Sequence, residues 1–236
     1  MNPRRASPPH RIAAVVPSLR LLACEVFFDF DNTISTSDII DDILRRFSVD
    51  REWLAFEQQW LAGQIGSKQC LTAQLRSVRI TQDKLARFLA TVHVEPHFSP
   101  LVAWLEAQGI QPVILSDSFS FIIQEILKQA QNGARRLPVH SNAMTFEGDR
   151  LIPSFPHVDG CARCANCKAR YILDAQRRGR DVIYVGDGLS DVCAAKHADL
   201  VFAKATLLDY CRQAGLPCVP YTDLGDVHAH LKELPL

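Results

Sequence analysis

The sequence has no excess of charge of either sign and no long apolar run. Its 236 residues include 26 Lys and Arg and 26 Asp and Glu, so the formal net charge is zero. A balanced charge gives no support for a nucleic-acid or other polyanionic partner. No apolar run comes near the roughly 18 residues that a membrane span needs. We therefore expect no nucleic-acid partner and no membrane partner.

The first residues also lack the clean apolar core of a secretory signal. Residues 1–10 are rich in Arg and Pro, and residues 12–22 are interrupted by Pro17, Ser18 and Arg20. A signal peptide would need a longer uninterrupted apolar stretch. We expect residues 1–20 to be a disordered extension or the result of a start codon placed too early, and we expect a cytoplasmic location by default.

Internal repeats and low-complexity linkers are absent, and 47% of the residues are hydrophobic. This content and length suit one α/β domain with an insertion. Apolar runs typical of buried strands occur at 24–27, 112–115, 181–185, 200–203 and 218–220, separated by segments of helical periodicity. Because such alternation implies parallel strands, we predict a Rossmann-like, mostly parallel sheet flanked by helices.

One long segment lacks any strand pattern. Between residues 38 and 92 apolar side chains recur at helical spacing, without strand-like alternation. We therefore predict an α-helical cap over residues 37–94, inserted after the first strand. A small β-hairpin is predicted around Gly148. The remaining core domain takes residues 21–36 and 95–236.

Two carboxylates, Asp29 and Asp31, follow the first predicted strand where it should end. In an open α/β sheet, ligands bind at the carboxyl ends of the strands. A first Asp can act as a nucleophile, and an Asp two residues on can act as acid and base beside it. The same residues would also suit an Asx-type turn followed by a helix cap.

Ser116, Lys168, Asp187 and Asp191 stand at other predicted strand ends or helix starts. Parallel topology would gather them at one edge, where several carboxylates need a cation such as Mg²⁺. A Ser hydroxyl and a Lys ammonium suit phosphate oxygens. Singly, these residues would more often be helix caps or solvated side chains. Together they predict phosphoryl transfer to Asp29.

The ordered motifs Asp29-Phe30-Asp31-Asn32-Thr33, Ser116, Lys168 and Gly186-Asp187-Gly188-x-x-Asp191 resemble those of haloacid dehalogenase (HAD) superfamily phosphatases. The resemblance covers nearly all of residues 24–225 and is to subfamily IB, which includes the phosphoserine phosphatases. It implies a HAD core with a C1-type helical cap. It also implies a Mg²⁺-dependent hydrolase of small-molecule phosphate esters, which we expect to be a monomer or a homodimer.

The resemblance also implies roles for individual residues. Asp29 would be the nucleophile that becomes an aspartyl phosphate, Asp31 the acid and base, and Thr33 a residue that fixes the loop. Lys168 would act in catalysis and in phosphate binding. Ser116 and Asp117 would share the phosphate-binding role. The metal would be held by Asp29, Asp31, Asp187 and Asp191.

Two groups of relatives suggest different substrates. The Ser116-Asp117 pair and the cysteines before Lys168 resemble the phosphocholine/phosphoethanolamine phosphatases, whereas Asp191-Val-x-Ala-Ala-Lys196 resembles the methionine-salvage phosphatases. Asp38 lies at the offset where phosphoserine phosphatases contact the substrate amine, and Asp117 matches a residue that binds a cationic head group. We therefore expect Asp38 and Asp117 to bind substrate.

The leading substrate prediction is an amino-alcohol or amino-acid phosphate, of the phosphocholine, phosphoethanolamine or phosphoserine type. The alternative is 2-hydroxy-3-keto-5-methylthiopentenyl-1-phosphate of methionine salvage. A phosphomutase and a non-catalytic sensor are further alternatives.

The chain has eight cysteines, five of them scattered among apolar neighbours as small core residues are. The other three form Cys161-x-x-Cys164-x-x-Cys167. With His157 they have the residue types of a four-ligand structural zinc site. A redox-sensitive thiol pair and a merely packed loop are the alternatives.

Overall fold

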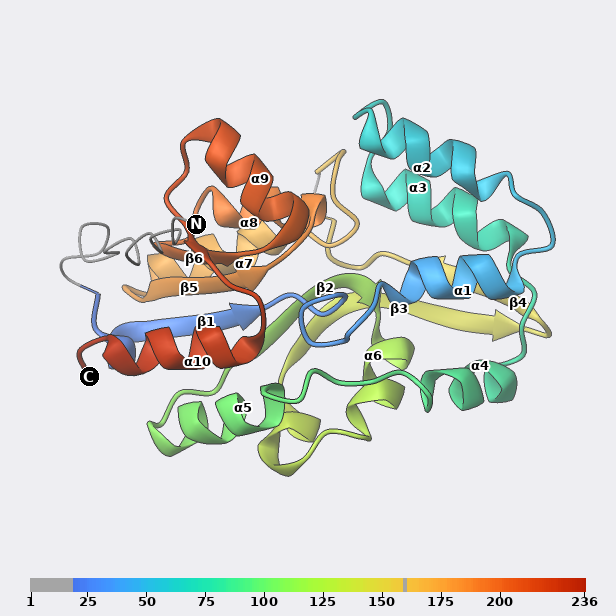
Figure 1. Ribbon diagram of the computed structural model, residues 1–236. Helices are drawn as coiled ribbons and strands as arrows, with labels where there is room; N and C mark the ends of the chain where they lie inside the picture. Colours follow the sequence, from blue (N-terminus) through green and yellow to red (C-terminus); the bar gives the residue numbers. More distant parts are fainter. Residues whose placement is uncertain (1–18, 159–160) are drawn as a thin grey trace, which may run out of the picture.

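The computed structural model describes residues 19–158 and 161–236. In this part of the chain, seven strands form one sheet in the order β4-β3-β2-β1-β5-β6-β7 (Figure 1). Every neighbouring pair is parallel except β3 and β4. The predicted extension of residues 1–20 lies, apart from Leu19 and Arg20, outside the described residues. The strands are β1 (Cys24–Phe28), β2 (Val113–Phe119), β3 (Val139–Glu147), β4 (Arg150–Ser154), β5 (Asp181–Gly186), β6 (Leu200–Ala203) and β7 (Val219–Pro220).

Helices cover both faces of the sheet (Figure 1). Side chains alternate between the faces of a strand, so Phe27 packs with Ile172 of α7, whereas Val26 and Phe28 join the larger core cluster with α5, α6 and α10. The predicted mostly parallel α/β fold is confirmed. These helices are α5 (Phe98–Ala107), α6 (Ser120–Leu127), α7 (Lys168–Arg177), α8 (Val192–Ala195), α9 (Ala205–Ala214) and α10 (Leu224–Glu233).

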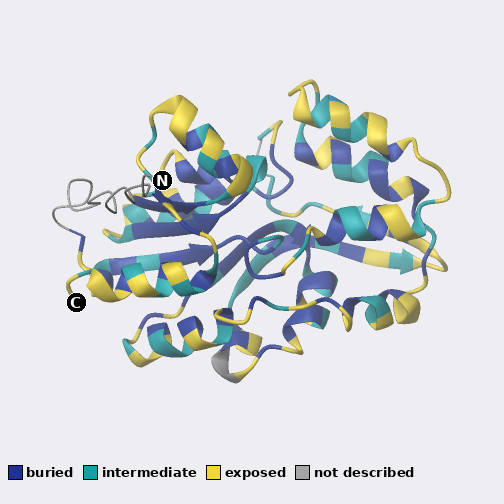
Figure 2. Ribbon diagram, viewed as in Figure 1, coloured by how far each residue is buried: buried dark blue, intermediate teal, exposed yellow. Residues whose placement is uncertain are grey.

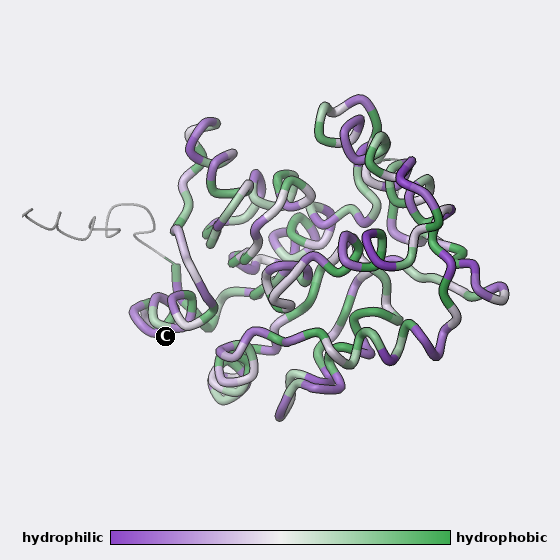
Figure 3. Tube along the Cα trace, turned by 45° about the vertical axis from the view of Figure 1, so that its right-hand side comes forward, coloured by the Kyte–Doolittle hydropathy of each residue, from purple (hydrophilic) through white to green (hydrophobic). Residues whose placement is uncertain are grey.

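The layers are also visible in the distribution of burial. Figure 2 shows the central strands mostly dark blue, while the helices carry exposed yellow residues on their outer sides. The helices change between hydrophobic and hydrophilic residues along their length (Figure 3), as amphipathic helices do. None of the helices in the described ranges combines the length and the apolar character that a membrane crossing needs.

Four helices follow β1: α1 (Ile39–Phe47), α2 (Trp53–Leu61), α3 (Ser67–Gln74) and α4 (Gln82–Leu89). In Figure 1, α2 and α3 lie side by side and stand away from the sheet. In contrast, α4 packs against α6. The boundaries of the cap at residues 37 and 94 stay a prediction.

The second strand is longer than its apolar residues predict. The predicted strand stops at Leu115, but β2 continues to Phe119, with a shift of register against β3 between these residues. The chain stays extended there because Phe119 is buried and pairs with Asn142. The hairpin around Gly148 consists of β3 and β4. It is not a separate unit, because β3 also pairs parallel with β2 and so belongs to the main sheet.

Candidate active site

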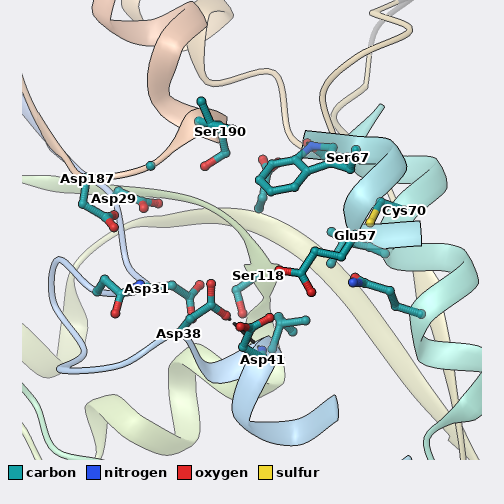
Figure 4. A pocket seen from close by; sticks show the side chains of 18 residues that line it. Asp29, Asp31, Asp38, Asp41, Glu57, Ser67, Cys70, Ser118, Asp187 and Ser190 are labelled. Atoms are coloured by element: carbon teal, nitrogen blue, oxygen red, sulfur yellow. Dashed lines mark hydrogen bonds between the residues drawn. The ribbon is translucent and has the colours of Figure 1, made fainter. Parts of the chain in front are cut away.

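The carboxyl ends of β1, β2 and β5 open onto a pocket whose opposite wall comes from α1, α2 and α3 (Figure 4). Asp29 directly follows β1, and its N–H donates to the Val185 carbonyl of β5 at 2.8 Å. Asp187 directly follows β5. Both aspartates, together with Asp31, line the pocket. Parallel pairing of β1 with β5 therefore brings together residues that are far apart in the chain.

A buried ammonium group lies between two of the carboxylates. Lys168, the first residue of α7, is 1% exposed, and its Nζ donates to Asp29 Oδ1 and to Asp191 Oδ1 at 2.6 Å each. Burial alone would lower the pKa of Lys168, but the Asp191 and Asp29 carboxylates outweigh burial and hold it above its usual value. Lys168 is therefore a fixed positive charge against the oxygen of Asp29.

Asp191 organises this end of the sheet through both of its oxygens. Oδ1 accepts from Lys168 and from the Tyr184 hydroxyl. Oδ2 accepts from the N–H groups of Asp187 and Gly188 at 3.0 Å each. A Cβ on Gly186 would lie 2.5 Å from Asp191 Oδ2, so only glycine fits there. Asp191 thus holds Asp187 and Lys168 in place.

The carboxylates of Asp29, Asp187 and Asp191 fit a divalent cation. Each offers an oxygen, and the three oxygens all lie within 4.8 Å of one another. Burial and the Asp191 charge raise the pKa of Asp187 to about 7, and the same two causes raise that of Asp29. The single positive charge of Lys168 cannot neutralise three buried carboxylates, so a further cation is needed. Sites with only oxygen donors suit Mg²⁺.

We expect removal of divalent cations to abolish hydrolysis of an aryl phosphate and Mg²⁺ alone to restore it. The loss should be about 100-fold or more, because the carboxylates around Asp29 would repel an incoming phosphate. The measurement is phosphate release after dialysis against a chelator, with and without added Mg²⁺. The circular-dichroism spectrum checks that the dialysed protein remains folded. Full turnover in chelator would contradict the metal site.

Asp31 and Thr33 lie in the turn after β1. Asp31 Oδ1 accepts from the Ile39 N–H at 3.1 Å, at the start of α1, and its side chain is not among the three grouped carboxylates. Its pKa is raised by burial and by the nearby charge of Asp38. The Thr33 hydroxyl donates to Asp187 Oδ1 at 3.4 Å, which ties the turn to β5. The predicted metal role of Asp31 stays a prediction.

Three polar residues, Ser116, Asp117 and Ser118, lie near the end of β2, and the phosphate-binding role of the first two stays a prediction. Ser116 is fully buried, and its hydroxyl accepts from the Ser118 N–H at 2.9 Å. Ser118 lines the pocket, and its buried hydroxyl has no hydrogen-bond partner among the described residues. Asp117 also lines the pocket, and its Oδ1 accepts from the Asn166 N–H at 3.0 Å. The structure therefore adds Ser118 as a candidate phosphate ligand.

The wall from α1–α3 combines acidic and apolar side chains. Asp38 and Asp41 of the α1 start and Glu57 of α2 carry the acidic groups. Asp38 caps α1 by accepting from the Asp41 N–H at 3.0 Å. Trp60 and Leu71 are among the apolar residues, and the Trp60 indole N–H donates to Ser67 Oγ at 3.0 Å, which orients the ring.

Several structurally important residues escaped the sequence analysis. Tyr184 and Tyr221 look like ordinary strand or core aromatics in sequence, but Tyr221 bonds to the Thr33 hydroxyl at 3.3 Å. Asn166 holds the carbonyls of Ser116 and His140 with its side chain. Its position two residues before Lys168 was the one signal that could have indicated a structural role.

The comparisons with known proteins identify the family of the chain. A family described as "Putative Phosphatase" matches residues 24–206. The chain belongs to this phosphatase family. Together with the fold, this makes it a HAD-type phosphatase, and Mg²⁺ dependence is general among such enzymes.

The proteins and solved structures that resemble the chain carry different names. A protein of Brevibacillus brevis named 2-hydroxy-3-keto-5-methylthiopentenyl-1-phosphate phosphatase is 28% identical, over 89% of this chain and 95% of that protein. The Pdp3-interacting factor 1 of Schizosaccharomyces pombe is also 28% identical, with 89% and 95% covered. A phosphoserine phosphatase solved as a phospho-aspartyl intermediate analogue has a TM-score of 0.68 at 17% identity, covering 88% of this chain and 98% of its own. This last likeness supports the fold alone.

Proposed function

We propose that this phosphatase hydrolyses a small phosphomonoester, with 2-hydroxy-3-keto-5-methylthiopentenyl-1-phosphate as the first candidate substrate. The observation that carries the candidate is the similarity, along almost the full length of both chains, to enzymes of that name. The apolar part of the pocket wall, with Trp60 and Leu71, offers a surface for a methylthio group. The order of the two substrate predictions is thereby reversed, and the former alternative comes first.

The proposed chemistry runs in two steps at Asp29. In the first, the Asp29 carboxylate attacks phosphorus, the ester P–O bond breaks, and Asp31 gives a proton to the leaving oxygen. In the second, water attacks the phosphorus of the aspartyl phosphate, the Asp29–phosphate bond breaks, and Asp31 takes the proton. Lys168 neutralises charge on the transferring group. Bound Mg²⁺ would supply further charge neutralisation and would be held by Asp29, Asp187 and Asp191, of which Asp191 also positions Asp187.

The second candidate substrate is an amino-alcohol or amino-acid phosphate. The observation that favours it is the acidic wall formed by Asp38, Asp41 and Glu57 opposite Asp29. Carboxylates placed there attract an ammonium group and disfavour a neutral substrate of the same size. The charge of Asp41 is partly neutralised by an ion pair, since Arg45 Nη2 lies 2.9 Å from Asp41 Oδ2. Asp38 and Glu57 are therefore the acidic groups to test.

A substrate panel distinguishes the two candidates. Released phosphate is measured with the ketopentenyl phosphate, phosphocholine, phosphoethanolamine, phosphoserine and a neutral sugar phosphate. We expect kcat/KM for the ketopentenyl ester to exceed that for each other ester by about tenfold or more, a difference of about 1.4 kcal/mol.

The variants Asp38→Asn and Glu57→Gln test whether the acidic wall binds the ammonium group of a substrate. Both keep side-chain shape while removing a negative charge from the pocket wall. If the amine esters are the true substrates, the variants lower kcat/KM for those esters and leave the sugar phosphate unchanged. A wild-type preference for phosphocholine or phosphoserine would overturn the first candidate.

A further inference from the structure

Four cysteines lie beside the active site without taking part in its chemistry. Cys161, Cys164 and Cys167 belong to the loop between β4 and α7, and their Sγ atoms all lie within 4.8 Å of one another. The fourth is Cys193 of α8, which lies outside that group of three but close enough to Cys164 for the two thiols to interact, an interaction that lowers the pKa of Cys193. All four are free thiols in the described structure. In sequence, Cys193 is one of the five scattered cysteines that resemble small core residues.

The backbone of the cysteine loop folds around the sulfur atoms. Burial raises the pKa of the Cys161 thiol, but the backbone N–H groups of Arg163 and Cys164 lie close enough to outweigh burial and lower it. Burial also raises the pKa of Cys167, and there the Arg170 N–H opposes burial without outweighing it. Backbone donors aimed at sulfur favour the thiolate form, which is the form that binds a metal.

We propose that Cys161, Cys164, Cys167 and Cys193 together hold a structural zinc ion, with sulfur in all four ligand positions. Tetrahedral coordination with Zn–S bonds of ~2.3 Å places the sulfur atoms ~3.8 Å apart, so the loop thiols need only small movements to enclose the ion. Soft sulfur ligands select zinc over the hard Mg²⁺ of the neighbouring site. Four protein ligands leave no open position, which makes the site structural and not catalytic.

The predicted fourth ligand, His157, is not part of the group of three cysteines, and its role as a zinc ligand stays a prediction that this proposal does not use. The His157 ring instead packs edge-on against His140 and Tyr171, with ring centroids 6.3 Å and 6.2 Å away. Its backbone carbonyl accepts from the Cys167 N–H at 3.2 Å, so His157 supports the loop through its main chain.

The surrounding charges suit four thiolates around one divalent ion. Such a centre carries a net charge of about −2, since four thiolates exceed the charge of Zn²⁺ by two. Arg163, Lys196 and His197 all lie close enough to Cys193 to stabilise a negative charge on its sulfur. The cluster is thus placed in a locally basic part of a chain that is neutral overall.

A zinc ion here would join three parts of the molecule. Cys167 directly precedes Lys168, and Cys193 follows Asp191 by two residues, so both ends of the buried ion pair would be anchored. The loop also contacts α3, because the Ser67 N–H donates to the Arg163 carbonyl at 2.7 Å. In Figure 1 the loop between β4 and α7 rises between α8 and the α2–α3 pair. The zinc would therefore fix Lys168 relative to the pocket wall.

Metal analysis of the purified full-length chain tests the proposal. We expect about one zinc per chain in the wild type, and the same content in His157→Ala and in the control Cys218→Ser. Cys164→Ser and Cys193→Ser should lose zinc to a chelator at least about tenfold faster, because each removes one of four ligands. Cobalt-substituted wild type should show thiolate-to-metal charge-transfer absorption.

Each contrary result overturns the proposal. A wild type that binds neither zinc nor cobalt, or a disulfide found among these cysteines by peptide mass spectrometry, would do so. Zinc lost in His157→Ala but kept in Cys193→Ser would reject the ligand set. The wild-type measurements need no variant, so a Cys variant that fails to fold does not prevent the test. None of these outcomes depends on the substrate.

Discussion

Asp29→Asn is expected to lower kcat by about four orders of magnitude or more, because it removes the nucleophile while keeping the shape of the side chain. Asn cannot form the acyl phosphate through which the proposed reaction passes. The variant should still fold, since Lys168 keeps its contact with Asp191 at 2.6 Å. The measurement is steady-state hydrolysis of an aryl phosphate in saturating Mg²⁺.

Asp209→Asn is the matched control, because Asp209 lies exposed on α9 and outside the pocket. It carries the same chemical change and should keep wild-type turnover. If Asp29→Asn also retained full turnover, with its purity established by mass spectrometry, Asp29 would not be the nucleophile and the proposed mechanism would be rejected.

Lys168→Met is expected to have the second-largest effect, and it acts on both activity and stability. Met fills a similar volume but leaves the buried Asp29 and Asp191 carboxylates without their shared cation. Loss of the charge that faces the phosphate should lower kcat/KM by about 10³-fold. Removal of one partner from a buried ion pair should cost about 3–5 kcal/mol of unfolding free energy.

Mg²⁺ should stabilise Lys168→Met against thermal unfolding more than it stabilises the wild type, since in the part of the chain that the structure describes no other side-chain cation pairs with these two carboxylates. Lys128→Met is the control, because Lys128 is exposed at the end of α6 and pairs only with Glu125 of the same helix among the described residues. Equal melting temperatures and equal KM values for Lys168→Met and wild type would contradict the role given to Lys168.

The main features of the fold could be predicted because each depends on a local pattern. Apolar runs marked the strands of the core, and helical spacing marked the helices after β1. The continuation of β2 through Ser116 and Asp117 could not be predicted, because it depends on the burial of Phe119 and its pairing with Asn142 in β3. Pairing across the sheet is not encoded in the composition of one strand.

Some residues of the candidate site could likewise be predicted from the sequence, and others could not. Asp29, Lys168 and Asp187 could be identified because charged residues at strand ends and helix starts are conspicuous in sequence. Cys193 and Ser118 could not, because a single Cys or Ser resembles many core or capping residues until the fold shows its neighbours. His157 is the opposite case, because its residue type suits zinc but its ring packs against Tyr171.

The most direct test of the central claim is chemical trapping of the covalent intermediate. Wild-type enzyme is mixed with excess substrate and Mg²⁺, quenched in acid, reduced with borohydride, and digested for peptide mass spectrometry. Reduction of an aspartyl phosphate yields homoserine, and we predict homoserine at position 29 only in samples that received substrate. Homoserine at another position, or none in samples that are releasing phosphate, would contradict the assignment of Asp29 as the nucleophile.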